Sequence, residues 1–425
     1  MTTLMILIFV IGYLAITLEH NIHINKTATA LLTGVLCWVV YALNATDVHL
    51  VSEQLSHHLG DIAEIVFFLL GAMTIVELVD AHDGFAIITQ KIKTQDIKTL
   101  MWLVALLTFF MSAVLDNLTT AIVMVSLLRK ILVSSETRKI MVGLVVIAAN
   151  AGGAWSPLGD VTTTMLWIGK QVSAMGVITQ LLLPSMVSLI VPLIYLHLTL
   201  KPKGNVFSAK LENTMALPNA ERNLMFAVGL GALLFVPVFK TVTHLPPYMG
   251  MLMGLGAVWL VSELIHKDKD EETKSKYSAV HALRKIDTPS ILFFLGILVA
   301  IAALESTEQL HHFAEWMNQT LGNQDLIVFI IGIASAVIDN VPLVAASMGM
   351  YDLQAFPTDS KLWEFMAYCA GTGGSMLIIG SAAGVAVMGM EKIDFMWYFK
   401  KISFVALLGY VAGAAVYLAL YSFTH

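Results

Sequence analysis

The feature that most constrains this chain is the recurrence of long apolar runs, separated by short polar breaks, along its whole length. Roughly 20 apolar residues cross the hydrocarbon core of a bilayer as a helix. Hydrocarbon offers no partners to the backbone, so such runs must satisfy their own hydrogen bonds and fold as helices. Charged residues make up only 13% of the chain, against about 25% in soluble domains. The sequence therefore predicts an all-α polytopic membrane protein with no soluble domain left over.

The expected membrane helices are the segments in which apolar residues dominate; they cover residues 4–18, 27–43, 61–80, 140–168, 176–200, 223–241, 247–265, 288–308, 362–390 and 402–422. Two further regions, 99–128 and 325–350, each hold two half-length apolar segments with polar residues between them. Polar backbone at membrane depth is tolerated only when it is buried in protein or lines a cavity. We therefore expect each region to form a re-entrant hairpin, which enters and leaves on one side.

The two hairpin regions spell almost the same six residues, SAVLDN at 112–117 and SAVIDN at 335–340. The similarity extends to both flanks: FLLG precedes the first hairpin where FFLG precedes the second, and ANAGG follows the first where AGTGG follows the second. The order of helix, hairpin and glycine-rich helix thus occurs twice.

This duplication predicts two repeats, each with about five transmembrane helices and one re-entrant hairpin. The first repeat covers residues 1–200, a cytoplasmic linker covers 201–222, and the second repeat covers 223–425. Glycine and proline should break the helices that follow the hairpins, 140–168 and 362–390, at the bilayer midplane.

Loop charges indicate that the repeats point in opposite directions. Basic residues surround the first hairpin: Lys91, Lys93, Lys98, Arg129, Lys130, Arg138 and Lys139. Mostly acidic residues surround the second: Glu308, Glu315, Asp325, Asp352 and Asp359, with Lys361. By the positive-inside rule the first hairpin opens to the cytoplasm, the second opens to the other side, and both termini lie outside the cytoplasm. Inverted repeats with broken helices are typical of secondary transporters.

Oxygen-bearing side chains cluster at the first hairpin tip and at the break in the following helix. The candidate ligands for a cation or proton are Asp116, Asn117, Thr119, Thr120, Asn150, Ser156, Asp160, Thr162 and Thr163. Sodium is a hard cation that takes oxygen ligands, and we expect it at Asp116, Asn117, Asn150 and Asp160. An aspartate at the bilayer centre costs about 2.5–3.5 kcal/mol and so requires a partner or a task. The alternatives are a backbone-capping role for Asp116 and back-bonding by the hydroxyls.

The second half offers a different set of side chains. Its candidates are Asp339, Asn340, Thr372, Ser375 and Ser381. Pro342 stands where the first tip has a hydroxyl, and no acid matches Asp160. The two sites are therefore expected to be unequal, and residue spacing leaves open whether Asp339 binds a second ion or carries the proton.

Four further residues precede or flank the hairpins. Glu77 and Glu305, in the helices before the hairpins, are candidates for a proton relay, with a solvated helix end as the alternative for Glu77. His57 and His58 are expected in a solvated loop.

Taken together, four segments resemble the NhaD-type sodium/proton antiporters of the ion transporter superfamily, whose relatives include arsenite pumps and sodium-coupled dicarboxylate carriers. They are SAVLDNLTTAIVM, NAGGAWSPLGDVTTTM, SAVIDNVP and GTGGSMLIIGSAAG. The resemblance covers nearly the whole chain. It implies an outer scaffold around the hairpins and broken helices, elevator-like motion, cation sites at the tips and a homodimer. Carboxylate carriers typically show Ser-Asn-Thr at both tips, whereas this chain has Asp in place of that Ser twice.

We therefore expect an antiporter that exchanges sodium or lithium for protons, because the metal cation and the proton compete for the same acid. It would reside in the bacterial inner membrane, with both termini periplasmic, and support salt tolerance and pH homeostasis. Its partners would be the transported ions and the lipid bilayer, with no nucleic acid and no organic cofactor.

The sequence leaves two other classes of protein as alternatives. An anion carrier for arsenite or a dicarboxylate would need basic or amide groups at the site, and no Arg or Lys lies inside the predicted breaks. A membrane enzyme is disfavoured because the chain has neither H-E-x-x-H nor G-x-S-x-G.

Overall fold

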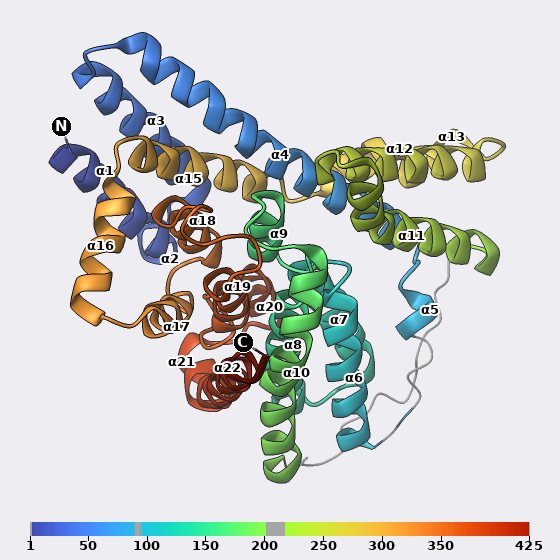
Figure 1. The fold of residues 1–425 in the computed structure, drawn as a ribbon. Coiled ribbons are helices and arrows are strands. Elements are labelled where there is room, and N and C mark those ends of the chain that lie inside the picture. The colour runs from blue at the N-terminus through green and yellow to red at the C-terminus, as the bar shows by residue number, and fades with distance from the viewer. Residues whose placement is uncertain (1, 90–93, 95, 201–216, 425) are drawn as a thin grey trace.

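The computed structural model describes residues 2–89, 94, 96–200 and 217–424 (Figure 1). Within these ranges every regular element is a helix, which confirms the predicted all-α membrane fold. Residues 201–216 of the expected linker lie outside the described part of the chain, as do Lys91 and Lys93.

The helices of the first half follow the predicted order; they are α1 (Thr2–Thr17), α2 (Glu19–Ile22), α3 (Lys26–Asn44), α4 (Val48–Ala81), α5 (Ala86–Thr89), α6 (Ile97–Ser112), α7 (Asn117–Ile131), α8 (Ser135–Ala154), α9 (Val161–Ile168) and α10 (Ala174–Thr199). Those of the second half are α11 (Asn219–Thr243), α12 (Pro247–His266), α13 (Glu271–Tyr277), α14 (Ala279–Lys285), α15 (Thr288–Ser306), α16 (Gln309–Leu321), α17 (Gln324–Ala334), α18 (Asn340–Met350), α19 (Lys361–Gly373), α20 (Ala382–Glu391), α21 (Phe395–Tyr398) and α22 (Phe404–Thr424). A π-helical turn, Phe399–Ser403, joins α21 to α22.

Long apolar helices and paired short ones alternate as the sequence predicted. Among the described residues, seven helical segments are long and apolar enough to cross a membrane. Short helices lie on both sides of each expected tip, α6 and α7 at the first and α17 and α18 at the second. Their re-entrant path in a membrane remains a prediction. The expected broken helices are present as α8/α9, interrupted at residues 155–160, and α19/α20, interrupted at residues 374–381.

Besides several helices of four to seven residues, two longer helical segments were not expected from the sequence. Helix α4 starts at Val48 rather than near residue 61, because Asp47 caps it and residues 48–59 contain no glycine or proline. His57 and His58 therefore lie on a helix instead of in a loop. Helix α16 is amphipathic and buries Leu310, Ala314 and Met317 at helical spacing, although its mean polarity resembles that of a loop.

The helix packing follows the same scheme in the two halves. Helix α3 packs on α15 and, correspondingly, α12 packs on α4. Likewise α6 packs on α8, as α17 packs on α19, and α10 pairs with its counterpart α22. The two hairpins lie on opposite sides of the molecule in Figure 1. Their opposite orientation in a membrane remains a prediction.

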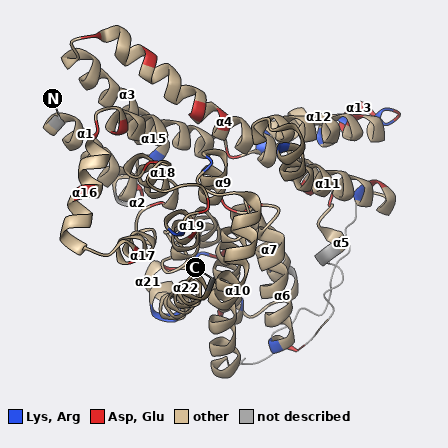
Figure 2. Cartoon of the chain, in the orientation of Figure 1, with Lys and Arg blue, Asp and Glu red and all other residues tan. Residues whose placement is uncertain are grey.

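The two broken helices form the centre of the molecule. Every residue from Met141 to Ala154 in α8 and from Leu362 to Gly373 in α19 is buried. Figure 2 shows that charged residues are sparse in this central part and more frequent around the ends of α12 and α13. The polar side chains Asn150, Asp160 and Ser381 therefore lie buried among mostly uncharged residues.

Candidate functional site

The first hairpin turns at Asp116, which has the positive φ of 77° and caps α7. Its Oδ1 accepts a hydrogen bond from the Thr119 backbone N–H at 2.8 Å, and its Oδ2 accepts one from the Thr119 hydroxyl at 2.8 Å. A positive φ is uncommon for a residue other than glycine and is held only where the surroundings enforce it. The capping role considered for Asp116 is thus present, and the carboxylate still has lone pairs for a cation.

The break between α8 and α9 contacts this hairpin closely. A Cβ on Gly152 would lie 2.2 Å from the Phe109 carbonyl oxygen, so only glycine allows this approach. The hydroxyl of Ser156 donates to the carbonyl of Ala113 at the hairpin tip. Glycine and serine therefore serve to place the break against the tip, and the Ser156 hydroxyl proton is used structurally.

Asp160 caps α9 from the end of the break. Its Oδ1 accepts from the Thr162 backbone N–H at 2.9 Å and from the Thr162 hydroxyl at 2.8 Å. Its Oδ2 accepts from Asn117 Nδ2 at 2.9 Å. The hairpin tip and the broken helix thus meet at one carboxylate, of which only 2% of the residue surface is exposed.

A buried chain of amides extends this contact to the second half of the molecule. Asn117 Nδ2 also donates to Asn150 Oδ1 at 3.2 Å, and Asn150 Nδ2 donates to Ser381 Oγ at 3.0 Å. Ser381 caps α20 and occupies the position in the second break that Asp160 occupies in the first. The order Asp160, Asn117, Asn150, Ser381 links one hairpin with both broken helices.

Two buried hydroxyls near these residues in sequence have no protein partner among the described residues. They belong to Thr120 and Thr163, both fully buried. A buried polar atom without a partner calls for an explanation such as a water or an ion. Carboxylate, amide and hydroxyl oxygens together are the donor set that suits a hard cation, and the described part of the chain shows no ion pair at Asp116 or Asp160.

The second hairpin tip has different chemistry. Asp339 caps α18 through the Val341 backbone N–H, at 3.2 Å, and its Oδ2 lies 3.2 Å from the ammonium nitrogen of Lys26. Asn340 is buried beside it. Sequence reasoning missed Lys26, because no residue spacing links it to a hairpin tip 313 positions further along the chain.

The other predicted residues lie apart from the amide chain. Thr372 and Ser375 donate to the carbonyls of Tyr368 and Thr372, at 2.6 and 2.7 Å, as in the back-bonding alternative. Glu77 lies near the C-terminal end of α4, and its Oε1 is 3.5 Å from the Nζ of Lys285. Glu305 faces a separate pocket.

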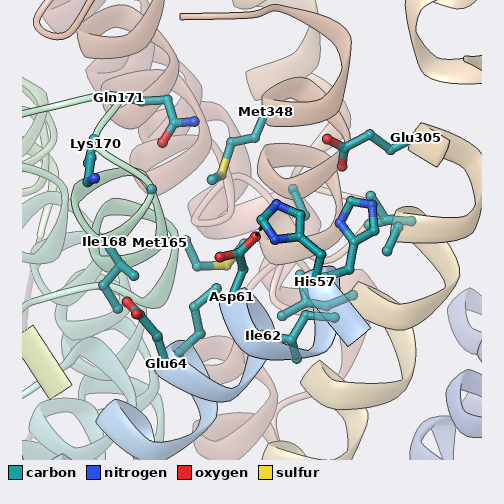
Figure 3. Close-up of a pocket in the computed structure, with 17 residues that line it drawn as sticks. His57, Asp61, Ile62, Glu64, Met165, Ile168, Lys170, Gln171, Glu305 and Met348 are labelled. Atoms are coloured by element: carbon teal, nitrogen blue, oxygen red, sulfur yellow. Dashed lines mark ion pairs between the residues drawn. The ribbon is translucent and has the colours of Figure 1, made fainter. Parts of the chain in front are cut away.

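That pocket, of about 480 Å³, lies between the helices α4 and α15 and the helices α9 and α18. Figure 3 shows Glu64 and Lys170 toward one end and Glu305 toward the other. His57 and Asp61 also line this pocket, and the Nε2 of His57 lies 3.9 Å from the Oδ2 of Asp61. A smaller cavity of about 70 Å³ borders Asp116, Asn117 and Thr119 directly. Water-accessible space therefore reaches the first tip, and it also reaches the end of α9.

Comparison with known proteins bears out the resemblance predicted from the motifs. Residues 6–363 match the family model described as citrate transporter (CitMHS). Sodium/proton antiporter 1 of Arabidopsis thaliana is 53% identical over 420 residues, 98% of this chain and 72% of that protein. Sodium/proton antiporter 2 of the same plant is 49% identical over 421 residues, 99% of this chain and 100% of that protein. The Na(+)/H(+) antiporter NhaD of Vibrio cholerae is 30% identical over 447 residues, 98% of this chain and 91% of that protein.

Proposed function

The chain belongs to the citrate transporter family CitMHS, and from this premise we propose that it exchanges sodium or lithium for protons across a membrane. The names of its similar relatives, sodium/proton antiporters from a plant and from a bacterium, support this proposal. The observation that carries it is the buried acid Asp160, bonded to Asn117 and linked through Asn150 to the opposite half of the chain.

The chemistry of exchange follows from the charge on this site. A buried carboxylate without an internal cation is costly, and either a proton or a sodium ion relieves that cost. Asp116 and Asp160 belong to one oxygen-rich site, where the two cations compete. A site that crosses the membrane only when neutralised exchanges one cation for the other, because the empty ionised form stays in place.

The motion we propose is elevator-like. The scaffold comprises α1, α3, α4, α11, α12 and α15, and the transport part comprises the hairpins, the broken helices, α10 and α22. Polar contacts across the halves support movement of the transport part as one body. Glu391 of α20 accepts from Arg129 at 2.5 Å and from Arg138 at 2.7 Å, two side chains of the first half.

We place the protein in a bacterial inner membrane as a homodimer with both termini periplasmic. The two Arabidopsis relatives favour a plant membrane as the alternative. Orientation is testable because the two native cysteines, Cys37 and Cys369, are buried. Cysteines introduced at the exposed positions Ser56 and Ser275 should react with an impermeant maleimide from opposite sides.

The test of function follows the proton gradient in everted vesicles from an antiporter-deficient bacterium, using a pH-sensitive dye. Sodium and lithium should each collapse part of the gradient, and Asp116→Asn should abolish the response at normal expression. A well-expressed wild type that gives no cation response from mildly acidic to alkaline pH would overturn the proposal.

An anion carrier is the second candidate, which the description of the family model as a citrate transporter favours. The same vesicles, given citrate and then arsenite, distinguish the two. A proton movement that depends on the anion and ignores sodium would establish the carrier instead. Against it, the described part of the chain places no free basic group at the first tip, and Lys26 at the second is paired with Asp339.

A further inference from the structure

Both hairpin tips begin with the same Asp-Asn pair, but the two aspartates have different hydrogen-bond and ion-pair partners. At the first tip, Thr119 supplies both a backbone N–H and a hydroxyl to Asp116. The corresponding residue at the second tip is Pro342, which has neither group. Asp339 therefore keeps one capping bond, from Val341 through Oδ1, and its Oδ2 is left for another partner.

That partner is Lys26, and three elements hold it in place. Its ammonium lies 3.2 Å from Asp339 Oδ2 of α18 and 4.4 Å from the centre of the Phe293 ring of α15, within the range of a cation–π contact. Its backbone N–H donates to Glu19 of α2 at 3.1 Å. The side chains of Lys26 and Asp339 are 27% and 18% exposed. Lys26 is therefore a positioned, half-buried residue rather than a mobile surface lysine. It begins α3 of the proposed scaffold, whereas Asp339 belongs to the proposed transport part, so the pair is formed in the state that this structure shows and separates when the transport part moves.

We infer that the Lys26 ammonium is a built-in cation of the second hairpin tip, which occupies Asp339 in place of transported sodium and limits the chain to one sodium ion, bound at the first tip. The inference rests on the proposed sodium/proton exchange. A sodium ion on Asp339 would lie next to the ammonium, and like charges at such a separation repel strongly where water is scarce. Asp116 and Asp160 have no such internal cation among the described residues, so sodium binds there.

The test measures equilibrium binding of radioactive sodium to the purified full-length protein in lipid nanodiscs. The wild type should bind one ion per chain. Lys26→Met, which keeps the length and removes the charge, should bind two, and adding Asp339→Asn to it should restore one. Lys26→Arg should stay at one.

A matched control is Lys361, which pairs with Asp325 at 2.6 Å and has a similar exposure, 33%. Lys361→Met should leave the count at one. Two ions per chain in the wild type would overturn this inference and leave the proposed exchange intact. A single ion with unchanged affinity in Lys26→Met would do the same.

A second readout is independent of sodium. In sodium-free choline buffer, Lys26→Met and Asp339→Asn should each lower the melting temperature, and the double variant should lose less than the sum of the two. Additive losses would show that the two charges do not interact, which would also overturn the inference. A wild type that binds no sodium, while this coupling persists, would instead refute the proposed exchange and leave the ion pair standing.

Discussion

Replacing Asp160 by asparagine should separate the charge of the first site from its architecture. The new amide can still accept the two bonds from Thr162, but its NH₂ group would face the NH₂ group of Asn117. Rotating the amides of Asn117 and Asn150 by half a turn removes this conflict. Asn117 then accepts from both neighbours, and Asn150 accepts from the hydroxyl of Ser381. The whole chain of bonds reverses direction without losing a member.

The effect of Asp160→Asn on the free energy of unfolding should therefore be much smaller than its effect on sodium binding. With every hydrogen bond replaced, the free energy of unfolding should change by less than about 1 kcal/mol. A sodium ion about 4 Å from a carboxylate gains about 4 kcal/mol at an effective dielectric constant of about 20. Losing that interaction weakens binding roughly a thousand-fold.

The assay is a sodium titration of thermal stability on the purified protein. Asp160→Asn should unfold near the wild-type temperature without sodium and should lose the sodium-dependent increase. Asp160→Ala is the contrasting variant: it gives up three hydrogen bonds and should destabilise the protein by about 2–4 kcal/mol. Sodium affinity within tenfold of wild type in Asp160→Asn would refute the reasoning.

Three other predictions concern packing and buried groups elsewhere in the fold. Gly152→Ala should destabilise the protein by about 1–3 kcal/mol, because the three atoms nearest to the new Cβ are all backbone atoms of Phe109, which cannot rotate away as a side chain can. Gly256→Ala, where a Cβ meets nothing within 4 Å, is the control, and equal losses in thermal unfolding would contradict the argument. Glu391→Gln should cost about 3 kcal/mol by leaving two arginines without their carboxylate, measured by the same method; an unchanged melting temperature would exclude that contribution. Burial lowers the pKa of His82, so the unfolded state binds the proton more readily and stability should fall as pH drops below about 6.5. His82→Gln should show a smaller acid-side loss, and an identical pH profile would rule out His82 as its source.

Much of the fold was predictable because its signals are local. Apolar length gave the long helices, and Gly153, Pro157 and Gly159 marked the break that the structure places at residues 155–160. The repeated Asp-Asn pairs marked both tips. The length of α4 was underestimated because residues 48–60 carry three histidines, two serines and one glutamate, and such a polar stretch forms helix as readily as loop.

The contacts that unite the site were not predictable, because they join positions far apart in the chain. The bond from Asn150 to Ser381 links the two repeats, and the pair of Lys26 with Asp339 joins the first loop to the second hairpin. Neither has a signal in residue spacing. Matching the repeats predicted that the two sites are unequal, and the long-range contacts show which partners each site has.

The asymmetry between the repeats depends on two exchanges, Thr119 against Pro342 and Asp160 against Ser381. In the first, Pro342 lacks the backbone N–H and the hydroxyl that Thr119 donates to Asp116, so Asp339 keeps one carboxylate oxygen for Lys26. The second removes an acid from the second break and supplies instead a hydroxyl that Asn150 can reach. The first tip thus keeps two acids that require a cation from outside, while the second balances its one acid internally. A duplicated architecture with this charge distribution favours a single transported sodium ion, held at the first tip by oxygens that both halves of the chain keep in place.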